Sequence, residues 1–226
     1  MLKPATRCAV LFDLDGTLVD TIGDITYALN AALEAAGVPS VTYDTCKQFV
    51  GRGLRNALLN ALQAAQVAPD EAQLDSLVEV MLKTYQKYPF QRAVVYPHIE
   101  ALLDKSVASG LQLGVLSNKD DDLVQEIVQA LFPKVPFISV QGASTTAPLK
   151  PDPTTALQFA QQAGCTVEEV LLVGDTEVDY YTAQEAGMPV AIATWGFRSR
   201  PELEAAGCKP LYDSVSHLAK EVFPWL

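Results

Sequence analysis

The segment LFDLDGTLVD, residues 11–20, is the most informative part of this chain. It joins a continuous apolar run, CAVLF at 8–12, to two aspartates, Asp13 and Asp15, that are separated by one residue. Residues i and i+2 of an extended chain point to the same side, so these carboxylates repel each other unless a cation lies between them or one carries a proton. In open α/β sheets, ligands bind beyond the carboxyl ends of the strands, which is where this pair falls.

Four further apolar runs of strand length follow, at 111–116, 135–140, 169–174 and 189–194. They are continuous rather than alternating, which is typical of strands in a parallel sheet covered on both faces. Segments with helical spacing lie between them, and several end at a glycine suited to a helix C-cap. This alternation predicts an α/β fold with a doubly wound parallel sheet.

The segment 20–93 interrupts the alternation, because it contains helical patterns and no convincing strand. Apolar residues such as Leu74 and Leu77 recur there at helical spacing. We therefore predict an all-helical cap at 20–93, inserted into a core formed by 1–19 and 94–226.

Composition excludes several classes of protein. The 226 residues carry a net charge of −11, and the 16 Lys and Arg are scattered, whereas a nucleic-acid-binding protein normally shows a basic patch. No run of about 18 apolar residues could span a membrane, and the N-terminus does not resemble a signal peptide. We therefore expect a cytoplasmic protein that binds neither nucleic acid nor a membrane.

The four cysteines, Cys8, Cys46, Cys165 and Cys208, are far apart and form no Cys-x-x-Cys pair. With only two histidines in the chain, this pattern disfavours a structural zinc site. We interpret the cysteines as small buried side chains in a reducing compartment.

Polar residues also follow the second and third core runs. Ser117 and Asn118 come directly after 111–116, and either residue type suits a helix N-cap. Alternatively, their side chains and the backbone N–H groups of a helix N-terminus would hold an anion such as phosphate. Lys150, in a loop between two prolines, is either an ordinary exposed lysine or a fixed positive charge in the site.

Asp175 and Asp179 follow the run at 169–174. They are either acids favoured at a helix N-terminus or, being four residues apart, two carboxylates on one face. Because strand ends at one edge of a parallel sheet converge, we expect both to lie near Asp13.

In this order, the segments DLDGT, SN, K-P and GDTEVD resemble the four motifs of the haloacid dehalogenase superfamily. The resemblance covers essentially the whole chain and implies a Rossmann-like core with an all-helical cap inserted after the first strand. It favours a phosphatase over a dehalogenase, because dehalogenases lack an aspartate at the position of Asp15.

The resemblance implies specific roles for these residues in phosphate ester hydrolysis. Asp13 is the nucleophile that forms an aspartyl-phosphate, and Asp15 is the general acid and base. Mg²⁺ is held by Asp13, Asp175 and the backbone carbonyl of Asp15, since it prefers oxygen ligands.

The resemblance also implies that other residues of the motifs act on the phosphoryl group and the metal. Ser117, Asn118 and Lys150 bind the phosphoryl oxygens, and Lys150 also takes part in catalysis. Asp179 orients metal-bound water or Lys150.

The predicted cap carries the signal for the substrate. Its segment KQFVGRGLRNAL, residues 47–58, resembles the phosphoglycolate phosphatase branch. Arg52 and Arg55 could meet a substrate carboxylate, or could simply be solvated.

The leading hypothesis is thus a Mg²⁺-dependent phosphatase for a small-molecule phosphomonoester, 2-phosphoglycolate above others, acting as a monomer or homodimer. A β-phosphoglucomutase-like phosphomutase and a non-catalytic regulatory module are the alternatives.

Overall fold

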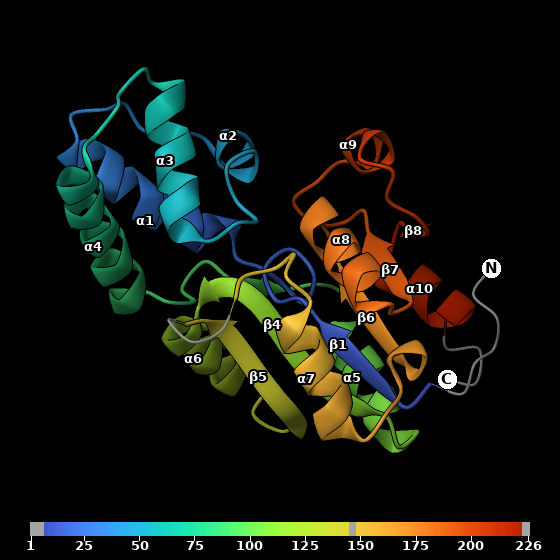
Figure 1. The fold of residues 1–226 in the computed structure, drawn as a ribbon. Helices are drawn as coiled ribbons and strands as arrows, with labels where there is room; N and C mark the ends of the chain where they lie inside the picture. The colour runs from blue at the N-terminus through green and yellow to red at the C-terminus, as the bar shows by residue number, and fades with distance from the viewer. Residues whose placement is uncertain (1–6, 145–147, 223–226) are drawn as a thin grey trace. The chain divides into compact units, whose positions relative to one another are not determined.

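The structure is a computed structural model, and it describes residues 7–144 and 148–222. The chain divides into two compact units, a core of Met1–Asp20 with Val95–Leu226 and a cap of Thr21–Val94 (Figure 1). The short strands β2 (Val19–Asp20) and β3 (Val94–Val95) pair with each other where the chain leaves the core and returns to it.

The core is built on a six-stranded sheet with the order β5-β4-β1-β6-β7-β8, in which all neighbouring strands are parallel. Its strands are β1 (Ala9–Phe12), β4 (Gln112–Asp120), β5 (Phe137–Ala143), β6 (Val170–Gly174), β7 (Val190–Ala193) and β8 (Leu211–Tyr212). The predicted fold class is confirmed. The edge strand β8 was not predicted, because two residues are too few to give a pattern.

Helices cover both faces of this sheet, as the continuous apolar runs require. In the view of Figure 1, α7 (Thr154–Ala163) and α8 (Glu177–Ala186) lie in front of the sheet, and α5 (Ile99–Ala108) lies behind it. α6 (Asp121–Leu131) packs against β4 and β5. The remaining elements are the 3-10 turn η1 (Val167–Glu169) and helices α9 (Arg200–Ala205) and α10 (Val215–Val222).

The four residues of β1 are all buried, and its side chains alternate between the two faces. Ala9 and Leu11 join the apolar cluster that contains Phe159 of α7 and Ala183 of α8. A Cβ at Gly114 of the neighbouring β4 would overlap the Phe159 ring, so glycine is needed there for the close approach of α7. The packing therefore holds β1 at the centre of the core.

β1 lies between β4 and β6, so the residues that follow these three strands gather at one edge of the sheet. The ladder continues one residue beyond β1, since the Asp13 backbone N–H donates to the Val173 carbonyl at 2.8 Å. Phe12 pairs with Val115 of β4 and Val173 of β6, so the next residue, Asp13, is held between these two strands.

The cap consists of α1 (Ile22–Ala35), α2 (Tyr43–Lys47), α3 (Leu54–Ala64) and α4 (Glu71–Lys87). Its interior is formed by fully buried side chains from three of these helices: Leu29 and Leu33 of α1, Leu58 and Leu62 of α3, and Met81 of α4. The helical spacing of the sequence indicated α1, α3 and α4, whereas the five-residue α2 is too short to show it.

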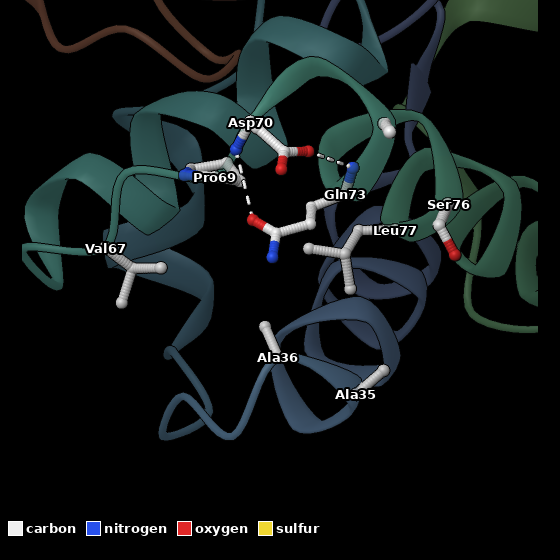
Figure 2. A pocket seen from close by; sticks show the side chains of 9 residues that line it. Ala35, Ala36, Val67, Pro69, Asp70, Gln73, Ser76 and Leu77 are labelled. Atoms are coloured by element: carbon white, nitrogen blue, oxygen red, sulfur yellow. Dashed lines mark hydrogen bonds between the residues drawn. The ribbon is translucent and has the colours of Figure 1, made fainter.

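α4 begins with a capping box, in which the Asp70 side chain accepts from the Gln73 N–H at 2.8 Å and the Gln73 side chain accepts from the Asp70 N–H at 3.1 Å (Figure 2). A pocket within the cap opens beside this first turn, against Ala35 and Ala36 at the end of α1 and against Val67.

The cysteines correct one expectation. Cys46 and Cys208 are free and buried, as predicted, but Cys8 and Cys165 form a disulfide with their Cα atoms 6.1 Å apart. These two residues are 157 positions apart in the sequence, and they meet because α7 returns the chain to the start of β1. Within the described residues, no helix is long and apolar enough to cross a membrane.

Candidate active site

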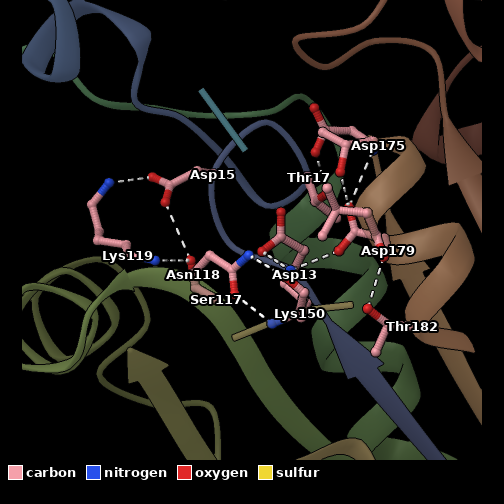
Figure 3. A network of polar contacts seen from close by, with 12 residues as sticks. Asp13, Asp15, Thr17, Ser117, Asn118, Lys119, Lys150, Asp175, Asp179 and Thr182 are labelled. Carbon is pink, nitrogen blue, oxygen red and sulfur yellow. Dashed lines mark hydrogen bonds and ion pairs between the residues drawn. The ribbon is translucent and has the colours of Figure 1, made fainter. Parts of the chain in front are cut away.

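The site lies at the carboxyl edge of the sheet, around the buried side chain of Asp13 (Figure 3). The Lys150 Nζ approaches Asp13 Oδ1 at 2.7 Å and Asp179 Oδ1 at 2.6 Å, and all three side chains are at most 8% exposed. One ammonium thus bridges a carboxylate that follows β1 and a carboxylate in the first turn of α8, and Lys150 is not an ordinary exposed lysine.

The backbone of Lys150 is held by Asn118. The Asn118 side chain donates from Nδ2 to the Lys150 carbonyl at 2.9 Å and accepts from the Lys150 N–H at Oδ1, at 2.8 Å. This two-point contact reproduces the hydrogen bonding of a strand partner, so it fixes the lysine loop to the end of β4. The predicted contact of Asn118 with phosphate remains a prediction beside this observed role.

Asp179 performs two tasks with its two oxygens. Oδ2 accepts from the Thr176 N–H at 3.1 Å and from its hydroxyl at 2.7 Å, which caps the first turn of α8, while Oδ1 binds Lys150. Asp179 therefore lies in the first turn of α8, as an acid favoured at a helix start, and it also contacts Lys150 beside Asp13.

Asp175 is fully buried and enclosed by the backbone. Oδ1 accepts from the Thr17 hydroxyl at 3.2 Å, and Oδ2 accepts from the Phe197 N–H at 2.7 Å. A Cβ at Gly16 or Gly196 would overlap the Asp175 carboxylate, and Gly16 also has a φ of +86°. Both positions therefore need glycine.

Asp13, Asp175 and Asp179 could hold a metal ion together. Each offers one carboxylate oxygen within 4.8 Å of the others, and all three side chains are buried. Three oxygen donors at this spacing fit a hard divalent cation such as Mg²⁺. The side chain of Asp15 lies outside this group, and a metal contact through its backbone carbonyl stays a prediction.

The electrostatics of the site also fit a cation. Burial raises the pKa of Asp13 to about 7, although the Lys150 ammonium lowers it, and the carboxylates of Asp179 and Asp15 raise it further. Burial and the Asp13 charge raise the pKa of Asp175 well above its usual range. A divalent cation here would favour the ionised form of both groups.

Ser117 and Lys119 hold the Asp15 side chain. The Ser117 hydroxyl donates to Asp15 Oδ2 at 3.3 Å, and Lys119 Nζ lies 2.5 Å from Asp15 Oδ1. The expected helix N-terminus at Ser117 is wrong, because β4 continues to Asp120 and α6 begins only at Asp121.

In the cap, Gly51 and Gly53 have φ of +116° and +85°, which explains the two glycines of this turn. Arg52 is exposed at its centre. The guanidinium of Arg55 is bound by two acids of α4, at 2.6 Å from Glu71 Oε2 and in contact with Asp75. Among the two predicted carboxylate-binding residues, Arg55 is thus already engaged within the cap.

Three residues of the site were not singled out from the sequence. Thr17 is the last residue of the recognised DLDGT segment and Lys119 directly follows the SN segment, so their places in the motifs were a usable signal. The Phe197 N–H reaches Asp175 from a distant loop, and no local pattern indicates this contact.

Comparison with known proteins agrees with this geometry. The family model of the haloacid dehalogenase-like hydrolases matches residues 10–193, which include all the core motifs. The chain belongs to this family. The family and fold predicted from the four motifs are therefore confirmed.

Curated relatives place this haloacid dehalogenase-like hydrolase near one branch of the family. It is 33% identical to a phosphoglycolate phosphatase of Rhodospirillum rubrum, over 93% of this chain and 88% of that protein. It is 35% identical to a phosphoglycolate phosphatase of Aquifex aeolicus, over 83% and 85%. A crystal structure from Lactobacillus delbrueckii subsp. bulgaricus matches with a TM-score of 0.91 at 27% identity, covering 96% of this chain and 99% of that one.

Proposed function

We propose that this hydrolase is a Mg²⁺-dependent phosphatase that cleaves 2-phosphoglycolate through an aspartyl-phosphate on Asp13. The enzyme class predicted from the sequence, a phosphoric monoester hydrolase, agrees with the curated relatives, which are named phosphoglycolate phosphatases. The observation that carries the proposal is the buried Asp13 carboxylate, which is paired with Lys150 beside two further acids.

Asp13 is suited to act as the nucleophile because it is the central charged group at the sheet edge. Its ion pair with Lys150 keeps the carboxylate oriented, and the same ammonium can bind an oxygen of the incoming phosphoryl group. For the other phosphoryl oxygens, the second hydrogen of the Asn118 amide is a possible donor, and the Ser117 hydroxyl would have to turn away from Asp15 to donate to one.

Asp15 is suited to both proton transfers. In the first step, Asp13 forms a bond to phosphorus, the bond to the alcohol oxygen breaks, and Asp15 gives its proton to that oxygen. In the second step, Asp15 takes a proton from water as the water oxygen bonds to phosphorus and releases the Asp13 carboxylate. The proton on Asp15 is thereby restored.

The acids Asp13 and Asp175, with the carbonyl of Asp15, would hold Mg²⁺, and Asp179 would orient metal-bound water or Lys150. When bound, the ion supplies positive charge that offsets the repulsion between the substrate phosphate and these carboxylates. Lys150 supplies a further positive charge next to Asp13.

The choice of 2-phosphoglycolate is supported by the named relatives and by the exposed Arg52 in the glycine turn of the cap. A guanidinium binds carboxylates in a two-point geometry, and this substrate carries a carboxylate one carbon from its phosphate ester oxygen. The monomeric or dimeric state and the cytoplasmic location remain predictions.

Phosphate release from a panel of esters tests this proposal. The panel contains 2-phosphoglycolate, sugar phosphates, nucleoside monophosphates and pyrophosphate, each with Mg²⁺ and with EDTA. We expect release that requires Mg²⁺ and is fastest with 2-phosphoglycolate, and a value of kcat/KM for that ester no better than for the others would refute the substrate assignment.

Two rivals give different results in the same assay. A phosphomutase would convert one sugar phosphate into an isomer with little release of phosphate, which chromatography of the products would reveal. A non-catalytic module would release no phosphate from any ester. Asp13→Asn should abolish turnover without unfolding the protein, and substantial remaining activity would contradict the role of Asp13.

A further inference from the structure

Lys119 places a buried cation beside Asp15. Its side chain is 2% exposed, and its Nζ lies 2.5 Å from Asp15 Oδ1. Ser117 and Lys119 are two residues apart within β4, so both side chains point to the same side of the strand. They therefore face the loop that carries Asp15 at the end of the neighbouring strand β1.

The contacts around Asp15 form a closed ring. The Ser117 hydroxyl donates to Oδ2 at 3.3 Å, Lys119 Nζ donates to Oδ1, and the Lys119 backbone N–H donates to the Ser117 Oγ at 3.2 Å. The last contact occupies a lone pair of the hydroxyl and leaves its hydrogen directed at Asp15. Figure 3 shows the Asp15 carboxylate turned toward these two residues. Each carboxylate oxygen thus has a donor of its own, which restricts rotation of the side chain.

We propose that Lys119 is a positioning residue for the proton transfers of Asp15, and this inference rests on the function proposed above. As the alcohol leaves, Asp15 loses its proton to the leaving oxygen and becomes a carboxylate. The adjacent ammonium stabilises that carboxylate and holds it where the second step needs a base. Hydrogen bonds between ionised groups are about twice as strong as neutral ones, so the contact is strongest in the form of Asp15 that follows proton donation.

Two other roles for the same cation predict different behaviour. If Lys119 only attracts the phosphate group, its removal weakens the reaction of every phosphate ester to a similar extent. If Lys119 binds the substrate carboxylate, its removal weakens only the reaction of esters that carry one. A positioning role instead makes the loss depend on how much the leaving oxygen needs a proton.

The test compares three esters: 2-phosphoglycolate, propyl phosphate and p-nitrophenyl phosphate. The first two release alkoxides that need a proton, and the third releases a phenolate that is stable without one. In Lys119→Met we expect kcat/KM to fall about 10–100-fold for both alkyl esters and less than about threefold for the aryl ester, because a positioning residue supports only part of the roughly 10²–10⁴-fold contribution of general acid catalysis. Lys119→Gln keeps a hydrogen-bond donor of similar length and should give a smaller loss with the same dependence on the leaving group.

The pattern of losses shows which part of the proposal fails. A uniform loss across the esters, or a loss confined to 2-phosphoglycolate, would overturn the positioning role. Asp15→Asn should show the same dependence on the leaving group, and if it does not, the proposed role of Asp15 itself fails. If Asp15→Asn shows that dependence and both Lys119 variants do not, only the inference about Lys119 fails.

Lys134→Met is the matched control, since Lys134 is exposed after α6, and it should leave all three reactions unchanged. Circular dichroism melting verifies that each variant is folded before its rates are compared. Lys119→Gln decides the question where the methionine variant does not fold.

Discussion

The substitution Lys150→Met would leave two buried carboxylates without the ammonium that lies 2.7 Å from Asp13 and 2.6 Å from Asp179. Methionine retains the apolar stem, so the main loss is the charge. Removing one partner of a buried ion pair costs about 3–5 kcal/mol, because the other charge stays behind without compensation. We expect a loss of this size in the free energy of unfolding at pH 8.5 in the metal-free protein.

The pH dependence of this loss in the free energy of unfolding tests whether Lys150 lowers the pKa of Asp13. The pKa of Asp13 in the folded protein, about 7, exceeds its value in the unfolded chain, so the folded state binds an extra proton at lower pH. Its contribution therefore destabilises the wild type as the pH rises toward 7 and then becomes constant. Without Lys150, which lowers this pKa, the decline continues to higher pH. At about 1.4 kcal/mol per pH unit, a variant in which Asp13 stays protonated to pH 8.5 loses about 2 kcal/mol between pH 7 and pH 8.5. The wild type loses about 0.4 kcal/mol over this range, since its Asp13 is half ionised at pH 7, so the variant should lose about 1.6 kcal/mol more.

Urea unfolding in EDTA, followed by circular dichroism at pH 7 and pH 8.5, measures both quantities. The difference between variant and wild type removes the contribution of the other titrating groups. Lys134→Met, at an exposed lysine, should show no such difference. An equal cost of Lys150→Met at the two pH values would refute the reasoning, as would an unchanged pH dependence when Asp13→Asn is added to the variant.

Three further predictions concern the metal and the cap. Gly196→Ala should weaken Mg²⁺ binding at least about tenfold in calorimetry, because its Cβ would displace Asp175, and wild-type affinity would contradict this. Mg²⁺ affinity should rise between pH 5.5 and pH 8, because Asp13 and Asp175 have raised pKa values and must release their protons to bind the ion. A constant affinity over this range would count against these two ligands. Arg52→Ala should raise KM for 2-phosphoglycolate, whereas Arg55→Ala should leave KM within about twofold, because two acids of α4 already bind the Arg55 guanidinium. Equal effects of the two substitutions in steady-state kinetics would disprove this distinction.

Much of the fold could be predicted because short local sequence patterns specify most of its strands and helices. β1, β6 and β7 are short continuous apolar runs, and α1, α3 and α4 show helical spacing. β8 and α2 are too short to produce a period, so they were missed. The end of β4 was misplaced at the SN motif, because serine and asparagine suit a helix start as well as a strand end.

The sequence indicated most of the residues that gather at the candidate site, but it did not indicate which of their side chains contact one another. Asp13, Lys150, Asp175 and Asp179 follow strand ends, and the topology of a parallel sheet brings such residues to one edge. Lys119 was missed because a lysine next to a recognised motif is more often exposed than buried.

The order of strands and helices, the insertion of the cap and the residue types at each strand end were determined by the sequence, because each depends on neighbours within one turn or one strand. The tertiary structure decided which charges meet. Lys150 joins Asp13 across 137 residues, Lys119 joins Asp15 across 104, and Cys8 joins Cys165 across 157. Such pairs depend on strand register and on the packing of α7 against β1, and local periodicity contains no information about either.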